Sequence, residues 1–157
     1  MTREEKFMNE AILLAEKGMK NGEGGPFGCV IVKENKIIGR GNNKVISTND
    51  PTAHAEIMAI REACQNLQEH QLENCEIFTS CEPCPMCLGA IYWARPKIIY
   101  YGNTRKDAAE IGFDDSLIYD EINKELNKRK IPMVNLSHKE AIKSFKIWQE
   151  KEDKKNY

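Results

Sequence analysis

The sequence predicts an α/β fold in which helices and short strands alternate within one domain. The chain has 157 residues, a length typical of a single domain. Its hydrophobic share of 41% and charged share of 30% are ordinary for a globular protein. Stretches with apolar residues at helical spacing alternate with short apolar runs, and this alternation is typical of layered α/β architectures.

The first half of the chain is expected to form two helices and a hairpin. The predicted elements are a helix over 3–20, strands over 27–32 and 36–41, a polar loop over 42–52 and a helix over 53–67. Asn21-Gly22 marks the end of the first helix, because glycine and asparagine tolerate the backbone that follows a helix. Glu34-Asn35 is the short loop between the two strands.

The second half continues the alternation with less regular patterns. The predicted elements are a strand over 75–79, a helix over 85–94, a strand over 97–101, a helical turn over 105–110, a helix over 116–128, a strand over 133–136 and a helix over 139–150. Pro85 suits the first turn of its helix, where no backbone hydrogen bond is lost. Ile142, Phe145 and Trp148 form an apolar stripe on the last helix.

Charge and hydropathy disfavour two classes of partner. The net charge is −1, whereas proteins that grip a nucleic-acid backbone usually carry a basic patch. We therefore expect no stable nucleic-acid partner. No apolar run approaches the ~20 residues needed to span a bilayer, and the amino-terminal residues lack the apolar segment of a signal peptide. We expect a cytoplasmic protein without a membrane partner.

Two short motifs predict a metal site. They are His54-Ala55-Glu56 and Pro83-Cys84-Pro85-Met86-Cys87, which together match the H-x-E and P-C-x-x-C signature of zinc deaminases acting on bases. Cysteines three apart in a first helical turn lie on one face, and the helix N-terminus favours their thiolates. His54, Cys84 and Cys87 are thus expected to bind one Zn²⁺ per chain. Catalytic zinc sites keep three protein ligands and leave the fourth position to water.

Glu56 is the predicted general acid–base group. Two residues apart on an ideal helix, His54 and Glu56 would point about 200° apart around the axis. They can converge only at an irregular helix start, and Pro51-Thr52 indicates a start here. Glu56 is then able to take a proton from the attacking water and to deliver it to the substrate.

Other interpretations of the cysteines remain open. The chain has six cysteines, and three of them fall within the seven residues 81–87. A C-x-x-C pair alone could be a redox pair. A structural zinc site would need a fourth protein ligand, and Cys81 is the candidate. Four protein ligands would indicate a non-catalytic zinc module used for binding, whereas a buried Cys81 beneath the site would leave the catalytic interpretation intact.

The chain resembles the cytidine-deaminase-like zinc superfamily and, within it, the short bacterial guanine deaminases. The resemblance covers nearly the whole chain. It rests on four stretches: Gly24-Gly25-Pro26-Phe27-Gly28; Asn49-Asp50-Pro51-Thr52-Ala53-His54-Ala55-Glu56; residues 79–95; and Gly112-Phe113-Asp114-Asp115-Ser116. The first three are shared in part with cytosine and transfer-RNA adenosine deaminases. The fourth, with the terminal Lys155-Asn156-Tyr157, points to guanine.

This resemblance implies a three-layer α/β/α fold with a central mixed sheet of about five strands, a homodimer and a set of site roles. Glu56 and Asp115 are the implied catalytic residues. The implied substrate-binding residues are Phe27, Asn43, Ala55, Trp93, Asp115 and Tyr157. The resemblance also implies that about residues 132–157 are swapped between subunits, so that Tyr157 would close the partner's pocket.

The implied reaction is hydrolysis of guanine to xanthine and ammonia, in purine catabolism or salvage. Guanine presents adjacent N–H donors at N1 and its 2-amino group, and the carboxylate of Asp115 could accept both. Adenine and cytosine place a ring-nitrogen acceptor beside their amino group, and a buried mismatch of this kind costs about 1–3 kcal/mol or more. A deaminase of cytosine, transfer-RNA adenosine or guanosine is the alternative within the family.

Overall fold

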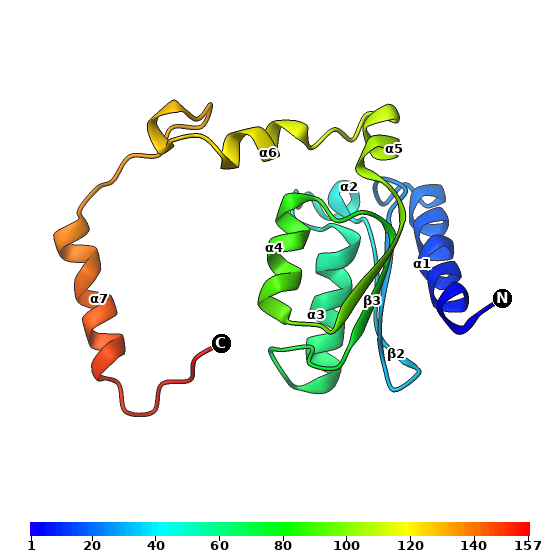
Figure 1. Ribbon diagram of the computed structural model, residues 1–157, viewed down its shortest axis with the longest axis horizontal. Helices are drawn as coiled ribbons and strands as arrows, with labels where there is room; N and C mark the ends of the chain where they lie inside the picture. Colours follow the sequence, from blue (N-terminus) through cyan, green and yellow to red (C-terminus); the bar gives the residue numbers. More distant parts are fainter. The chain divides into compact units, whose positions relative to one another are not determined.

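The computed structural model describes all 157 residues, which form two units, Met1–Asp115 and Ser116–Tyr157. The elements of the first unit are α1 (Arg3–Lys20), β1 (Gly28–Lys33), β2 (Lys36–Asn42), α2 (Val45–Thr48), α3 (Ala55–Leu67), β3 (Glu76–Cys81), α4 (Pro85–Ala94), β4 (Ile98–Asn103) and α5 (Arg105–Glu110) (Figure 1).

The sheet of this unit is mixed and has the strand order β2-β1-β3-β4. β1 is antiparallel to both of its neighbours, and Cys29 faces Gly41 on one side and Thr79 on the other. β3 and β4 are parallel, and the helix α4 provides the crossover connection that a parallel pair needs. The sheet therefore has four strands within the chain, where about five were expected.

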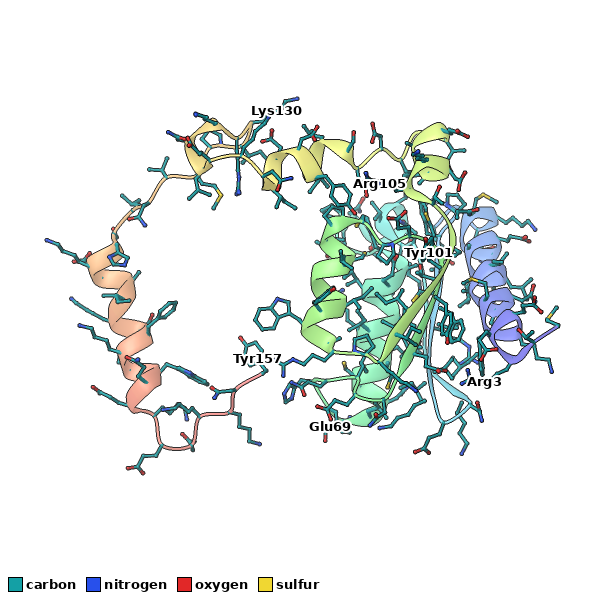
Figure 2. All side chains as sticks on the ribbon, in the orientation of Figure 1. Arg3, Glu69, Tyr101, Arg105, Lys130 and Tyr157 are labelled. Atoms are coloured by element: carbon teal, nitrogen blue, oxygen red, sulfur yellow. The ribbon has the colours of Figure 1, made fainter.

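Helices cover both faces of the sheet, which confirms the predicted three layers (Figure 1). On one face α1 packs Ala11 against Val30, Val32 and Phe78. α1 is further tied to β3 by an ion pair between Arg3 Nη2 and Glu76 Oε2 at 2.6 Å, and Figure 2 labels Arg3.

The opposite face of the sheet carries the larger core, which is built with α3 and α4. Its buried members are Cys29, Ile31, Ala55, Ala59, Ala63, Leu72, Cys75, Ile77, Ile91 and Ala94. α3 lies very close to β2, because a Cβ on Gly41 would be 2.1 Å from the Ala55 carbonyl oxygen. Only glycine fits at this crossing, so the approach of α3 to the sheet depends on it.

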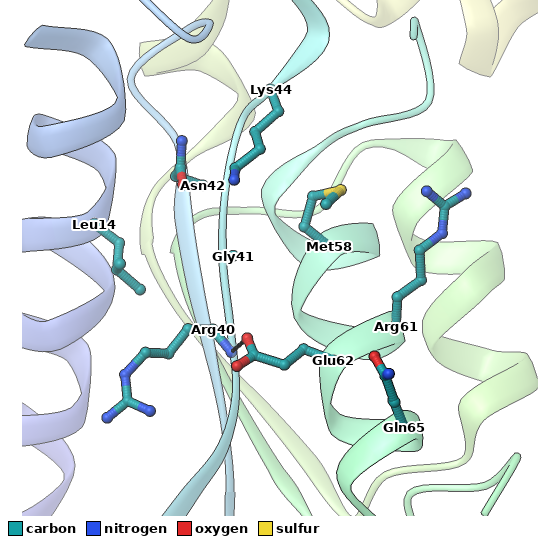
Figure 3. Close-up of a pocket in the computed structure, with 9 residues that line it drawn as sticks. All are labelled: Leu14, Arg40, Gly41, Asn42, Lys44, Met58, Arg61, Glu62 and Gln65. Atoms are coloured by element: carbon teal, nitrogen blue, oxygen red, sulfur yellow. Dashed lines mark hydrogen bonds between the residues drawn. The ribbon is translucent and has the colours of Figure 1, made fainter. Parts of the chain in front are cut away.

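The outer edge of β2 is closed by side chains from α3. The Glu62 carboxylate accepts a hydrogen bond from the Arg40 backbone N–H at 2.7 Å, and Asn66 Nδ2 donates to the Ile38 carbonyl at 2.8 Å. A cavity of about 380 Å³ lies along this edge between α1 and α3, and Figure 3 shows Glu62 beside Arg40 within it. None of the residues that line this cavity belongs to the predicted metal site.

The second unit contains α6 (Ser116–Ile122), the 3₁₀ turn η1 (Leu126–Lys128) and α7 (His138–Glu150). None of its residues is buried. Large apolar side chains are nevertheless frequent in it, among them Ile131, Val134, Leu136 and Phe145. Exposed apolar surfaces of this kind are typical of segments that pack against another surface.

Several expected boundaries were wrong. The strand predicted over 133–136 is irregular in the structure, because a strand needs a neighbour for its backbone groups and these residues have none. The helix predicted over 116–128 ends at Ile122. The helix predicted from 53 begins at Ala55, and the loop over 42–52 contains the short helix α2. None of the helices combines the length and apolarity that crossing a bilayer requires.

Candidate active site

The three predicted metal ligands lie together at the starts of two helices. His54 is the N-cap of α3 and Cys84 is the N-cap of α4, and both residues have extended backbones just outside their helices. Cys87 lies in the first turn of α4 and is fully buried. His54 Nδ1 is 3.5 Å from Cys84 Sγ and 3.6 Å from Cys87 Sγ. The ligand atoms of the three residues lie within 4.8 Å of one another, close enough to share one metal ion.

The chemistry of these donors fits zinc. The pKa of Cys84 is lowered to about 4, first because the Cys87 thiol donates a hydrogen bond to its thiolate, and further because His54 lies beside it. The hydrogen bond to Cys84 and burial in turn raise the pKa of Cys87. The lowered pKa favours the thiolate of Cys84, the form in which cysteine binds metal. Two sulfur atoms and an imidazole would suit zinc, and three protein ligands are the number typical of catalytic rather than structural zinc sites.

Glu56 points from the first turn of α3 into the same cluster. Its side chain is buried at 6% exposure, and burial is the main cause that raises the pKa of its carboxyl. Oε2 is 3.4 Å from Cys87 Sγ, while Oε1 accepts a hydrogen bond from Thr79 Oγ1 at 3.1 Å. Because His54 precedes the helix, the two side chains converge despite their spacing of two residues.

Cys81 lies apart from the metal cluster. It is buried at the end of β3, and its thiol contacts the Thr104 carbonyl oxygen at 3.7 Å. Burial raises the pKa of Cys81 to about 11, so that it stays a thiol at neutral pH. The group of side chains that can hold a metal consists of His54, Cys84 and Cys87 without it. The structure therefore favours an open, three-ligand site over a closed structural one.

Phe27, directly before β1, and Asn43, directly after β2, adjoin each other. The Asn43 backbone N–H donates to the Phe27 carbonyl at 3.0 Å, and Asn43 itself is buried. Gly24 allows this arrangement, because a Cβ there would lie 2.1 Å from Asn43 Oδ1. The Phe27 ring meets the Phe113 ring edge to face, with centroids 4.9 Å apart. Phe113 belongs to the fourth stretch of the resemblance, but no role at the site was assigned to it from the sequence.

The remaining predicted substrate-binding residues lie in four separate parts of the chain's structure. Ala55 is buried as the first residue of α3. Asp115 ends the first unit, and burial, followed by the negative charge of Cys84, raises the pKa of its carboxyl. Trp93 is 64% exposed and lies nine residues after Cys84 on α4, or about 13 Å along a helix. Tyr157 belongs to the second unit and ends the chain (Figure 2).

Thr79 is the site residue that sequence reasoning missed. Its hydroxyl contacts Glu56 from β3, where it occupies the inward row between Ile77 and Cys81. A polar residue within an otherwise apolar inward row is the signal that could have identified it.

Comparison with known proteins gives consistent matches. The family model for the cytidine and deoxycytidylate deaminase zinc-binding region matches residues 1–103. A guanine deaminase of Bacillus subtilis strain 168 is 53% identical over 98% of each chain. The crystal structure of the Bacillus subtilis guanine deaminase superposes with a TM-score of 0.95 over 98% of each chain.

The names of two more distant relatives give two different substrates, transfer-RNA adenosine and guanine. A transfer-RNA-specific adenosine deaminase of Buchnera aphidicola is 42% identical over 82% of this chain and 83% of its own. A guanine deaminase structure from Nitrosomonas europaea is 32% identical, with a TM-score of 0.65 over 69% of this chain and 63% of its own.

Proposed function

Because the chain belongs to the cytidine and deoxycytidylate deaminase zinc-binding family, we propose that it hydrolyses guanine to xanthine and ammonia. The observation that carries the proposal is the buried Glu56 carboxylate beside a cluster of three zinc-ligating side chains, which leaves one coordination position for water. The identity of 53% with a guanine deaminase over almost the whole chain supports guanine as the base. A non-catalytic zinc module would need neither Glu56 nor an open ligand position.

Glu56 moves the protons of the reaction. Zinc, when held by His54, Cys84 and Cys87, supplies Lewis-acid activation of water. The carboxylate of Glu56 accepts a proton from the attacking water and passes it to ring N3 of guanine. It then takes the second proton from the new hydroxyl at C2 and delivers it to the amine, so that the C–N bond breaks, ammonia leaves and the C2 carbonyl of xanthine forms. Burial suits Glu56 to this work, because it raises the pKa of the carboxyl and so favours the protonated form that must give the proton back.

Asn43 and Asp115 orient the base. The Val45 backbone N–H donates to Asn43 Oδ1 at 3.1 Å, which leaves the amide N–H₂ of Asn43 to donate to an acceptor on the base. Guanine offers the acceptors O6 and N7. Asp115 accepts from N1–H and the 2-amino group and so holds the reacting edge. Phe27, Ala55 and Trp93 line the space around the ring, and, through the swap proposed below, Tyr157 of the partner subunit closes it.

A substrate panel tests this assignment. We expect guanine to be deaminated faster than guanosine, adenine, cytosine or a transfer-RNA hairpin when products are separated by liquid chromatography. Asp115→Ala should lower the turnover of guanine sharply and retain zinc. Faster deamination of the hairpin or of cytosine would agree with the deaminase family but would refute guanine as the substrate.

We further propose that the protein is a homodimer in which about residues 132–157 are swapped between subunits. β4 ends the sheet and has a strand neighbour on one side only. In the second unit, Ile131, Val134 and Leu136 are each more than four-fifths exposed. A partner subunit that adds this apolar segment would cover both surfaces.

The six unpaired cysteines agree with a cytoplasmic location, where thiols stay reduced.

Complementation tests the swap. Full-length Glu56→Gln lacks the proton carrier but keeps its tail, whereas a chain lacking 154–157 keeps Glu56 but has no Tyr157. The mixed dimer then contains one complete site if the tail closes the partner's pocket. Co-refolding should restore up to about half of the wild-type activity per mixed dimer. If no activity is gained over the separate variants, the tail closes its own subunit and the swap is wrong.

A further inference from the structure

The side chain of Thr79 places a hydroxyl among apolar groups in the core of the sheet. It lies on the face of β3 that packs against α3 and α4, next to Cys29 on β1, and is 1% exposed. The residues around this position, including Ile31 and Ile77, belong to the larger hydrophobic core. A buried hydroxyl is destabilising unless its hydrogen bonds are made, so its partners indicate why it is there.

Both of its partners are acceptors that belong to the site or border it. Thr79 Oγ1 is 3.1 Å from Glu56 Oε1 and 3.1 Å from the Cys81 carbonyl oxygen. A hydroxyl has one hydrogen to donate, and a carboxylate is the stronger acceptor. The single hydrogen therefore goes to Glu56 Oε1, and the Cys81 carbonyl oxygen is only a close neighbour of the hydroxyl.

The second oxygen of Glu56 faces the metal ligands. Oε2 is 3.4 Å from Cys87 Sγ, on the side of the cluster. The terminal torsion of a glutamate is broad, so an unrestrained carboxylate could present either oxygen in many orientations. We propose that Thr79 is a positioning residue that reserves Oε1 and thereby directs every proton transfer of the reaction to Oε2. This inference rests on the role of Glu56 proposed above.

Substitutions that separate the hydroxyl from the methyl group test the proposal. Thr79→Val preserves the shape of the side chain but removes the hydroxyl. Its kcat for guanine should fall about tenfold to a hundredfold, the range expected for losing a hydrogen bond to a charged group. KM should change little, because Thr79 does not touch the base. Thr79→Ser keeps the hydroxyl and should retain most of the wild-type kcat.

A second pair of Thr79 variants and a control variant at a neighbouring residue separate the loss of the hydroxyl from effects on folding. Thr79→Ala and Thr79→Ser differ only in the hydroxyl, so their ratio of kcat values repeats the test without the methyl group. Ser80→Ala removes a neighbouring buried hydroxyl, which accepts from the Gly28 N–H at 3.0 Å, and should lower thermal stability while leaving kcat unchanged. Zinc content should stay at one ion per chain in every variant.

Crystal structures supply a readout that does not depend on turnover. The Glu56 carboxylate should be rotated away from its wild-type orientation in Thr79→Val and should keep that orientation in Thr79→Ser. A Val variant with wild-type kcat or an unrotated carboxylate overturns the proposal, and so does a Ser variant as slow as the Val variant. If the wild-type protein does not deaminate guanine, the proposed function fails, and the orientation of Glu56 in these structures still decides the role of Thr79.

Discussion

Replacing Glu56 with glutamine removes the proton carrier and little else. Glutamine has nearly the shape of glutamate, and its carbonyl oxygen can still accept the Thr79 hydroxyl where Oε1 does now, at 3.1 Å. Its amide would face Cys87, and His54, Cys84 and Cys87 remain to bind zinc. Because the carboxyl is buried and its pKa raised, a neutral side chain is tolerated here. We therefore expect Glu56→Gln to fold and to retain zinc.

The loss of activity in Glu56→Gln should be large. A positioned general acid–base group contributes about 10²–10⁴-fold, equivalent to about 3–5 kcal/mol of transition-state stabilisation. The assay is xanthine formation from guanine, followed by liquid chromatography, with zinc measured by mass spectrometry and folding by thermal melting. A zinc-loaded variant within tenfold of the wild-type rate would remove Glu56 from the mechanism. A variant without zinc would show instead that the carboxylate supports the metal.

Three further substitutions test how the site is built. Cys84→Ala should abolish zinc binding, whereas Cys81→Ala should retain zinc, since the Cys81 thiol contacts the Thr104 carbonyl and not the cluster; zinc loss in both would indicate a closed site of four ligands. Gly41→Ala should lower the melting temperature and zinc occupancy together, because the added Cβ would lie 2.1 Å from the Ala55 carbonyl and displace the start of α3. A wild-type melting temperature and full zinc occupancy in Gly41→Ala would show that the close contact with Gly41 does not determine the position of α3.

The ligands could be predicted from sequence because their spacing is local. A proline-cysteine start places Cys84 and Cys87 in one helical turn, and an irregular start lets Glu56 lie beside His54. Helical periodicity likewise located α1 and α4 closely. These features depend on a few neighbouring residues, so a single sequence is enough to identify them.

Features that depend on distant parts of the chain were harder to predict. Thr79 meets Glu56 only because β3 and α3 pack together, and no spacing in the sequence relates the two. The apolar pattern over 133–136 predicted a strand, but a strand forms only where another strand pairs with it. Trp93 was expected at the pocket from a resemblance alone, and in the single chain it is exposed at the far end of α4.

The most direct test of zinc-dependent guanine deamination is turnover of guanine measured before and after removal of the metal. The purified protein should contain about one zinc ion per chain and convert guanine to xanthine and ammonia. Dialysis against a chelator should abolish this activity, and stoichiometric zinc should restore it. Full activity in verified metal-free protein would contradict the assignment of His54, Cys84 and Cys87 as the ligands of a catalytic zinc ion.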